Sequence, residues 1–327
     1  MQTTYNISVI IPAKDEEESI PELSQWISRV MQAHGFSYEV IFIDDGSTDG
    51  TWDAIKKMNQ ENPAFKGFQF NRNFGKAAAL HTGFKAAKGE VVITMDADLQ
   101  DSPDEIPELY KLIKEQKFHL VSGWKKKRHD PISKTLPSKF FNAVTSKISG
   151  IKLHDFNCGL KAYDGRVVKN ISIYGDMHRY IPVIAKWAGF SKITEKVVEH
   201  RERKFGTSKY GWTRLISGFL DLLTLMFVGK FSKKPMHFFG SLGIVSFTMG
   251  FIFTMNLLWQ KVDSIYISKI PLKREVYQQP LFYLALVAVV IGVQLFLTGF
   301  IADLMARQSL SRKDYLVIDR LGIDSTE

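Results

Sequence analysis

The sequence contains a single cysteine, Cys158. One cysteine excludes an intrachain disulfide framework and fits a reducing compartment. The first eleven residues lack a basic stretch followed by a long apolar run, so we expect no secretory signal peptide. The sequence also lacks an aromatic-rich platform for single strands and any DNA-binding motif, and we therefore expect no nucleic-acid partner.

Charge is distributed unevenly along the 327 residues. Residues 1–100 carry 9 Lys and Arg against 14 Asp and Glu, whereas residues 101–234 carry 26 against 13. Residues 235–327 are nearly balanced, and the whole chain has a net charge of +9. The basic middle lies directly before an apolar third, so anionic lipid or phosphate suits it better than nucleic acid does.

Two segments near the C-terminus contain no Asp, Glu, Lys or Arg, and each is long enough to cross a bilayer: residues 236–259 and 280–302. A helical hairpin sealed inside a soluble protein is the alternative, but two such segments in succession favour membrane spans. We expect a transmembrane hairpin over residues 233–306. The flanking lysines and arginines favour a cytoplasmic location for both of its ends and for the tail at 307–327.

Two shorter segments are amphipathic. Apolar residues recur at helical spacing within residues 135–149, which predicts either a core-facing helix or a helix on the membrane surface. Residues 211–232 are more hydrophobic, but Asp221 would be costly at the middle of a bilayer. We therefore expect residues 211–232 to form an interfacial helix.

Strand and helix patterns alternate with short links through the first part of residues 1–210. Apolar strand-like runs occur at 7–12, 38–43, 65–71, 91–95 and 120–124, and helical patterns lie between them. This alternation predicts an α/β domain with a mostly parallel sheet and helices on both faces.

One motif, Asp96-Ala97-Asp98-Leu99-Gln100-Asp101, directly follows the strand-like run at 91–95. Side chains alternate along a strand, so Asp96 and Asp98 would point the same way at its carboxyl end, where open α/β sheets bind ligands. Hard carboxylate oxygens suit Mg²⁺ or Mn²⁺, which also bind phosphate oxygens. The pattern indicates a metal-diphosphate site; the alternative is a solvated strand end, where Asp is common.

Three motifs in this order resemble family 2 glycosyltransferases: Ile10-Ile11-Pro12-Ala13-x-x-Glu16-Glu17, then residues 44–51 (DDGSTDGT), then the Asp96 motif. Residues 157–163, 178–182 and 201–210 make the chain more similar to polyprenyl-phosphate glycosyltransferases, the type that includes dolichyl-phosphate mannose synthase and bacterial undecaprenyl-phosphate glucosyltransferases. The resemblance implies a Rossmann-like GT-A fold. Lys14-Asp15 departs from the family's usual aromatic residue followed by Asn.

The resemblance also implies roles for residues at matching positions. Asp96 would face the nucleotide-sugar, Asp98 would hold the metal on the diphosphate, and Gln100 would lie near the sugar or the acceptor. Lys76 either adds to nucleotide binding or is a solvated first-turn lysine. The nucleotide-binding residues would be Pro12, Ala13, Glu16, Asp45, Lys76, Asp96 and Ala97.

The nucleophile implied by the resemblance is a lipid monophosphate. Its second pKa lies near ~6, so it is largely a dianion at neutral pH and needs positioning more than deprotonation. Asp155 is either a base or orienting group, or an ordinary surface residue, and His178 and Arg179 belong either to this site or to a packed helix. Cationic and hydroxyl side chains would hold the phosphate, unless they are simply solvated: Lys125, Arg128, Arg201, Arg203, Ser208 and Lys209.

Taken together, the resemblance implies inverting transfer of one hexose-type sugar, such as glucose or mannose, from a UDP- or GDP-sugar to undecaprenyl or dolichyl phosphate. The product would donate sugar to cell-envelope glycans or proteins. The enzyme would use Mg²⁺ or Mn²⁺ at the inner cell membrane, and by analogy it would form a homo-oligomer, for instance a tetramer. The alternatives are a processive polysaccharide synthase, which usually carries Gln-x-x-Arg-Trp and more spans, and a non-catalytic membrane scaffold or lipid-sugar translocation protein.

Overall fold

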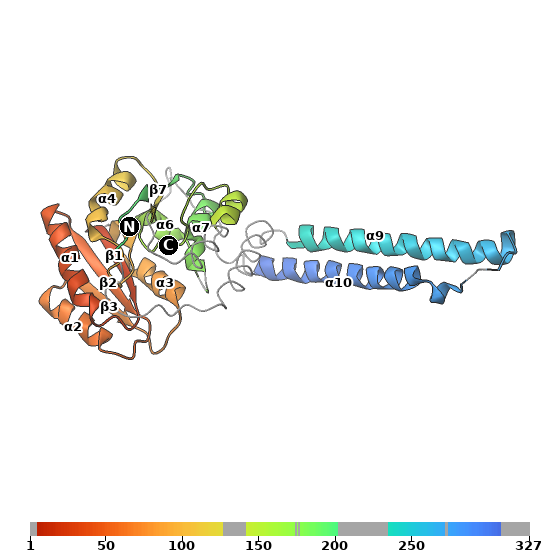
Figure 1. The fold of residues 1–327 in the computed structure, drawn as a ribbon, viewed down its shortest axis with the longest axis horizontal. Coiled ribbons are helices and arrows are strands. Elements are labelled where there is room, and N and C mark those ends of the chain that lie inside the picture. Colours follow the sequence, from red (N-terminus) through yellow and green to blue (C-terminus); the bar gives the residue numbers. More distant parts are fainter. Residues whose placement is uncertain are drawn as a thin grey trace, which may run out of the picture. The chain divides into compact units, whose positions relative to one another are not determined.

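The computed structural model describes residues 5–126, 142–173, 175, 177–201, 235–271 and 274–308. The chain divides into two compact units, Met1–Leu223 and Thr224–Glu327. The first unit contains the α/β fold and the second contains two long helices (Figure 1).

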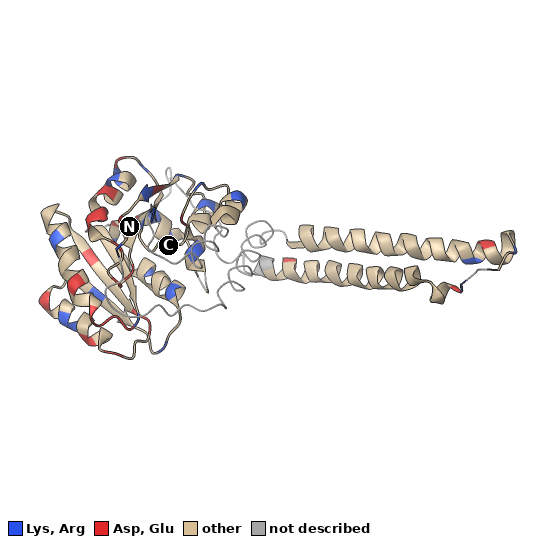
Figure 2. Ribbon diagram, viewed as in Figure 1, with Lys and Arg blue, Asp and Glu red and all other residues tan. Residues whose placement is uncertain are grey.

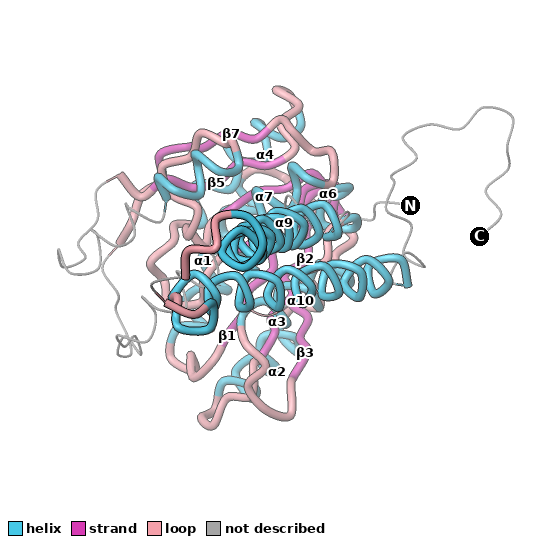
Figure 3. The backbone as a smooth tube through the Cα atoms, turned by 90° about the vertical axis from the view of Figure 1, so that its right-hand side faces the viewer, coloured by secondary structure: helices cyan, strands magenta, loops and turns pink. Residues whose placement is uncertain are grey.

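The first unit is built on one sheet (Figures 1 and 3). The sheet has seven strands in the order β3-β2-β1-β4-β6-β5-β7. Adjacent strands run parallel except at β6, which is antiparallel to both β4 and β5. The prediction of a mostly parallel sheet is therefore confirmed. The strands are β1 Tyr5–Ala13, β2 Tyr38–Asp44, β3 Phe65–Gln69, β4 Gly89–Thr94, β5 Leu120–Trp124, β6 Lys161–Asp164 and β7 Ile193–Val197.

Helices cover both faces of this sheet, as the alternating pattern predicted. Side chains alternate along β1, so Val9 and Ile11 join the core beneath α1, α2 and α4, whereas Ile10 joins the core beneath α3, α6 and α7. The helices are α1 Ser19–Ala33, α2 Thr51–Glu61, α3 Lys76–Ala86, α4 Ile106–Lys114, α6 Gly165–Asn170 and α7 Ile181–Trp187, with 3₁₀ turns η1 Pro103–Glu105 and η2 Met177–Tyr180.

A glycine allows helix α3 to pack directly against the sheet. A Cβ added at Gly83 would come within 2.4 Å of Ile10 Cγ2 and 3.1 Å of Ile43 Cδ1. The small alanines of α3 extend this close packing over the same face. The approach fixes the first residue of the helix, Lys76, beside the carboxyl ends of the strands.

The sequence pattern did not predict strands β6 and β7. β6 spans only four residues and begins with a lysine, so it lacks the apolar alternation that marks the earlier strands. As the antiparallel member, β6 enters the sheet at the edge where β4 and β5 end. The residues before β6 therefore lie at the same edge as the Asp96 motif.

The second unit contains α9 Pro235–Val262, which continues through the π-helical turn η3 Asp263–Ile267, then the short turn η4 Val276–Gln278 and α10 Pro280–Gln308. The stretches Pro235–Ile267 and Pro280–Met305 are long and apolar enough to cross a membrane by length and composition, and only 17% of an 18-residue apolar segment in each is buried. Figure 2 shows both helices almost free of charged residues over most of their length. They contain the predicted spans and are candidate membrane spans.

Small residues bring α9 and α10 into direct backbone contact (Figures 1 and 3). A Cβ at Gly292 would lie 2.6 Å from Phe247 N, and one at Gly250 would lie 2.8 Å from Ala285 O. Ser246 Oγ donates a hydrogen bond to Ala288 O across the pair at 2.8 Å. Small residues and polar cross-links are the usual means by which helices associate in lipid.

The predicted amphipathic helices are only partly described. Residues 142–149 are helical, in agreement with the pattern at 135–149. The rest of that segment up to residue 141, and the whole of residues 211–232, lie outside the described residues.

Candidate active site

The carboxyl ends of three strands bring the predicted site residues together at one edge of the sheet. β1, β2 and β4 run parallel and end at Ala13, Asp44 and Thr94. The motifs that follow these strands therefore meet in space although 30 to 50 residues separate them in the sequence. This edge is the usual ligand position in an open α/β sheet.

Asp96 is the electrostatic centre of this edge. Its carboxylate forms an ion pair with Lys76 at the start of α3, and both side chains are 33% exposed. Burial by itself would raise the pKa of Asp96, but the ammonium groups of Lys76, Lys125 and Lys161 lower it to about 2. Asp96 is thus ionised at neutral pH, and Lys76 is held at the site instead of being fully solvated.

The chain reverses sharply at Leu99, which adopts a left-handed conformation with φ of 61°. This turn lets the Gln100 backbone N–H donate to Asp98 Oδ1 at 3.2 Å, and Asp98 is buried. Left-handed backbone is uncommon for a branched residue and is concentrated at functional sites. The loop therefore holds the Asp98 carboxylate in a defined orientation at the sheet edge.

A distant segment pairs with this loop. Arg201 N donates to Gln100 O at 3.0 Å, Gln100 Nε2 donates to Arg201 O at 3.4 Å, and Asp101 pairs with His200 in an isolated antiparallel bridge. Sequence reasoning placed Gln100 and Arg201 in one site, and the structure brings them together through the backbone of Arg201 and both the backbone and the side-chain amide of Gln100. His200 lies beside them, and no sequence motif singled it out.

Asp45 is committed to the protein itself. Its Oδ1 accepts a hydrogen bond from Phe74 N at 2.7 Å and its Oδ2 accepts one from Gly75 N at 2.9 Å. These bonds anchor the segment that leads into Lys76. A carboxylate oxygen has further acceptor capacity, so the predicted nucleoside contact is compatible with this geometry.

The segment after β1 is fixed by reciprocal contacts with the loop after β2. Asp15 adopts a left-handed conformation with φ of 55°, and its Oδ1 accepts a hydrogen bond from Thr48 N at 2.9 Å. Glu16 N donates to Thr51 Oγ1 at 2.8 Å, and its Oε2 accepts from Ser19 Oγ at 2.9 Å. Asp tolerates this conformation nearly as well as Asn does, which explains how the chain accommodates its departure from the usual family sequence.

Asp155 is not a surface residue: its exposed fraction is 1%, so that alternative is wrong. Its Oδ1 accepts a hydrogen bond from Asn157 N at 3.0 Å. Nearby, burial chiefly raises the pKa of the Cys158 thiol to about 12, and this cysteine is a small buried residue as expected. Lys161, 4% exposed, donates from Nζ to Cys158 O, and sequence reasoning assigned it no role.

His178 belongs to the same charged neighbourhood. It lies on η2, which packs against α3. Burial, with the positive charges of Lys76, Arg179 and Lys161, lowers its pKa to about 3, although Asp96 acts in the opposite direction. His178 is therefore neutral at physiological pH and lies within electrostatic range of Asp96 and Lys76.

Two of the predicted acceptor residues have protein partners. The Lys125 ammonium lies 2.8 Å from Oδ1 of the fully buried Asp101, and although burial acts to lower the pKa of Lys125, Asp101 raises it. The Arg201 guanidinium lies 4.3 Å from the centre of the Trp26 ring. Arg128, Arg203, Ser208 and Lys209 lie outside the described residues.

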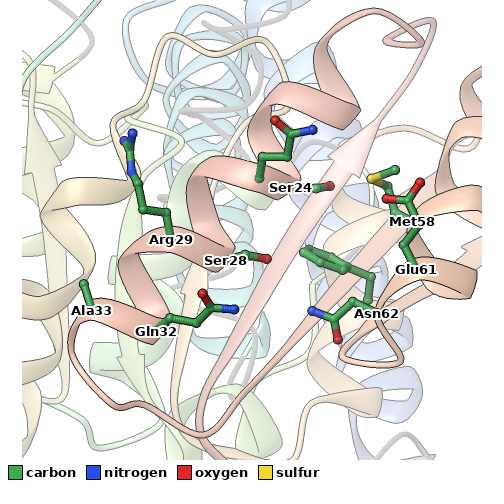
Figure 4. Close-up of a pocket in the computed structure, with 10 residues that line it drawn as sticks. Ser24, Ser28, Arg29, Gln32, Ala33, Met58, Glu61 and Asn62 are labelled. Carbon is green, nitrogen blue, oxygen red and sulfur yellow. The ribbon is translucent and has the colours of Figure 1, made fainter.

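Two surface hollows differ in their relation to these residues. A hollow of about 660 Å³ between α1 and α2 is lined by polar residues such as Ser28, Arg29 and Asn62, and none of the candidate site residues lines it (Figure 4). A second hollow, of about 650 Å³, is lined by Lys14, Thr48 and other residues that follow β1, β2 and β3. The second hollow lies next in sequence to Asp45 and is the one associated with the sheet edge.

Relatives with assigned names resemble the chain over most of its length. Dodecaprenyl-phosphate galacturonate synthase of Rhizobium johnstonii is 35% identical over 307 residues, covering 93% of this chain and 88% of that protein. Undecaprenyl-phosphate 4-deoxy-4-formamido-L-arabinose transferase of Pseudomonas syringae pv. syringae is 33% identical over 254 residues, covering 77% of this chain and 73% of that protein.

Solved structures share the fold of the first unit. Glucosyl-3-phosphoglycerate synthase from Mycobacterium tuberculosis, in complex with Mn²⁺, UDP-Glc and phosphoglyceric acid, matches with a TM-score of 0.52 at 19% identity, covering 70% of this chain and 80% of that chain. Mannosyl-3-phosphoglycerate synthase from Rubrobacter xylanophilus matches with a TM-score of 0.54 at 13% identity, covering 68% and 74%. The sequence model of glycosyl transferase family 2 matches residues 8–172. The chain belongs to glycosyl transferase family 2 and has its GT-A-like fold.

Proposed function

We propose that this protein transfers a single sugar from a nucleotide-sugar to a polyprenyl phosphate at a membrane surface. One observation carries the proposal: the ionised Asp96 and the buried Asp98 lie at the carboxyl edge of the sheet, in a chain that also has two candidate membrane spans. The names of two relatives, which specify dodecaprenyl and undecaprenyl phosphate, support the acceptor class.

The donor would bind along the strand ends. Lys76 lies at the Asp96 carboxylate, where it could also reach a diphosphate oxygen. The hollow lined by Lys14 and Thr48 is continuous in sequence with Pro12, Ala13, Glu16 and Asp45, to which the family resemblance assigns nucleoside binding. This arrangement supports a nucleoside diphosphate lying between α3 and the loops after β1 and β2.

A divalent metal fits the residues present if it shares its coordination with the substrate. Among the described residues, no group of three or more His, Cys, Asp or Glu could hold a metal. Asp98 offers hard carboxylate oxygens, and Mg²⁺ and Mn²⁺ are commonly held by one or two carboxylates together with substrate phosphates. We propose that Asp98 holds the metal. When bound, the metal would neutralise negative charge on the departing nucleoside diphosphate.

The acceptor phosphate would approach from the membrane side. It is a dianion at neutral pH, so this chain's task is to orient it and not to remove a proton. We propose that the basic residues after β5 and from Arg201 onward provide that orientation. We further propose that Asp155, being buried, orients neighbouring backbone and does not act as a base. Positive flanking residues support a multi-pass arrangement in the inner membrane with a cytoplasmic catalytic unit.

A donor screen tests the proposal. Membranes containing the full chain would be mixed with undecaprenyl phosphate, Mg²⁺ or Mn²⁺, and single UDP- or GDP-sugars, and release of nucleoside diphosphate would be recorded. We expect acceptor-dependent release from one donor. Because the named relatives carry different sugars, galacturonate and 4-deoxy-4-formamido-L-arabinose, the panel should include acidic and amino sugars beside glucose and mannose.

Two variants sharpen the screen. Asp98→Ala should abolish acceptor-dependent release, whereas Asp53→Ala should leave it unchanged, because the Asp53 side chain is 80% exposed on α2. Full activity in Asp98→Ala with metal present would refute the proposed metal site. Repeated addition of sugar to one acceptor would instead indicate a processive synthase, and absence of release from every donor by folded protein would favour a scaffold or translocation protein.

A further inference from the structure

The segment before β6 lies directly beneath the Asp96 carboxylate. A Cβ added at Gly159 would come within 2.4 Å of Asp96 Oδ2, 2.5 Å of its Cγ and 2.8 Å of its Oδ1. All three heavy atoms nearest to this Cβ position thus belong to the Asp96 carboxylate group. The backbone at Gly159 therefore packs against the carboxylate group of Asp96 and occupies the space into which this side chain could otherwise turn.

Two side chains hold this segment in place. Thr94, the last residue of β4, donates from Oγ1 to Gly159 O at 2.9 Å. Lys161, opposite Thr94 in the β4–β6 register, donates from Nζ to Cys158 O. Lys161 is 4% exposed, and a buried polar group of this kind is strongly disfavoured unless its hydrogen bonds are made.

The surroundings of the segment leave it little freedom. A Cβ at Gly123 of β5 would lie 2.7 Å from Cys158 Sγ and 2.9 Å from Leu160 O, so β5 packs closely against the other side. Burial lowers the pKa of Lys161, whereas the negative charges of Asp155 and Asp96 oppose that change. The Lys161 ammonium therefore lies within electrostatic range of the carboxylate that the segment supports.

We propose that residues 158–161 form a platform that fixes the orientation of the Asp96 carboxylate, with Lys161 and Thr94 as its positioning residues. The inference deepens the proposed function, since it concerns the residue that would face the nucleotide-sugar. Lys76 contacts Asp96 from the exposed side, where a donor phosphate could compete for it. The platform contacts Asp96 from the buried side and is independent of the donor. It keeps the carboxylate in place when Lys76 engages a ligand.

The first test is a double-substitution cycle that requires no known donor. Gly159→Ala should lower the thermal unfolding temperature, because the new methyl group overlaps the Asp96 carboxylate. In the Asp96→Ala background the carboxylate is absent and the same substitution should cause little or no change. Equal losses in both backgrounds would refute the packing of the platform against Asp96, whether or not the proposed transfer reaction is correct.

The second test measures transfer by Lys161→Met, which keeps the length of the side chain and removes its ammonium group. Coupling between contacting residues is commonly worth about two- to 150-fold, and we expect kcat/KM to fall about tenfold. In the Asp96→Asn background the further loss should be less than about twofold, because Lys161 acts through Asp96. If the fold-losses caused by Lys161→Met and by Asp96→Asn instead multiply in the double variant, the positioning role of Lys161 is refuted.

Two additional variants separate this role from folding. Lys169→Met is the matched control. Lys169 lies on α6, and its Nζ also donates to backbone carbonyls, those of Phe84 and Lys85 in α3, at 2.9 and 2.6 Å. It should leave kcat/KM unchanged. If Lys161→Met fails to fold, Thr94→Val removes the second support and should show the same dependence on Asp96. Inactive wild-type protein would refute the proposed function, whereas active wild-type protein with an unaffected Thr94→Val variant would refute the platform alone.

Discussion

Asp45→Asn separates two uses of one carboxylate, support of the protein and contact with a nucleoside. In the structure, its two oxygens accept hydrogen bonds from Phe74 N and Gly75 N at 2.7 and 2.9 Å. Asn retains one oxygen acceptor and replaces the other with an NH₂ donor, so one backbone N–H loses its partner and faces another donor. The carboxylate is buried, which prevents water from fully replacing the lost bond.

The expected magnitude follows from this geometry. A hydrogen bond to a charged group contributes about 1.5–3 kcal/mol, and the unsatisfied N–H keeps the cost near the upper part of that range, about 2–3 kcal/mol. For a domain of roughly 200 residues, 1 kcal/mol corresponds to about 2–4 °C, so the unfolding temperature of the catalytic unit should fall by about 4–12 °C. Donor affinity should fall as well, because the segment leading into Lys76 is no longer anchored.

Thermal unfolding of the detergent-purified chain, followed beside donor titration, measures both effects. Asp53→Asn provides a control at an exposed aspartate on α2 and should leave both quantities unchanged. An Asp45→Asn protein that loses donor affinity but keeps its unfolding temperature within about 1 °C would refute the anchoring role. It would show that the carboxylate serves chiefly as a ligand contact.

Three further substitutions and one change of conditions have defined outcomes. Glu39→Ala should destabilise the fold by about 2–4 kcal/mol in denaturant titration, because this buried carboxylate accepts hydrogen bonds from a hydroxyl, a backbone amide and a lysine ammonium; an unchanged midpoint would contradict this. Gly292→Leu should separate α9 from α10 and abolish disulfide cross-linking between one cysteine introduced into each helix, whereas Val290→Leu at an exposed position should not. Because the pKa of Asp96 is lowered to about 2, its ionised form persists down to that pH, and the rate of transfer between pH 5 and 8 should not follow its titration. Lys76→Met should move the acid limb of the pH–rate profile upward, and an unmoved limb would refute the electrostatic coupling.

Much of the fold could be predicted from local sequence patterns. The alternating strand and helix signals located β1 to β5 and the helices between them, since each element's periodicity is encoded within its own residues. The two uncharged segments likewise predicted α9 and α10, because span length depends only on consecutive residues. β6 and β7 were not found, since short strands with charged residues are formed by pairing with distant neighbours and not by their own pattern.

The candidate site, like the fold, could be predicted from the sequence only in part. The sequence by itself determined that Asp96 and Asp98 follow directly after a buried strand, because adjacency is a property of the chain. Only the tertiary structure decided that Lys76 pairs with Asp96, that Asp155 is buried, and that Lys161 lies beneath the site. Those facts depend on the antiparallel insertion of β6 between β4 and β5 and on the close approach of α3 to the sheet. Burial and ion pairing arise between segments far apart in sequence, so no local pattern could specify them.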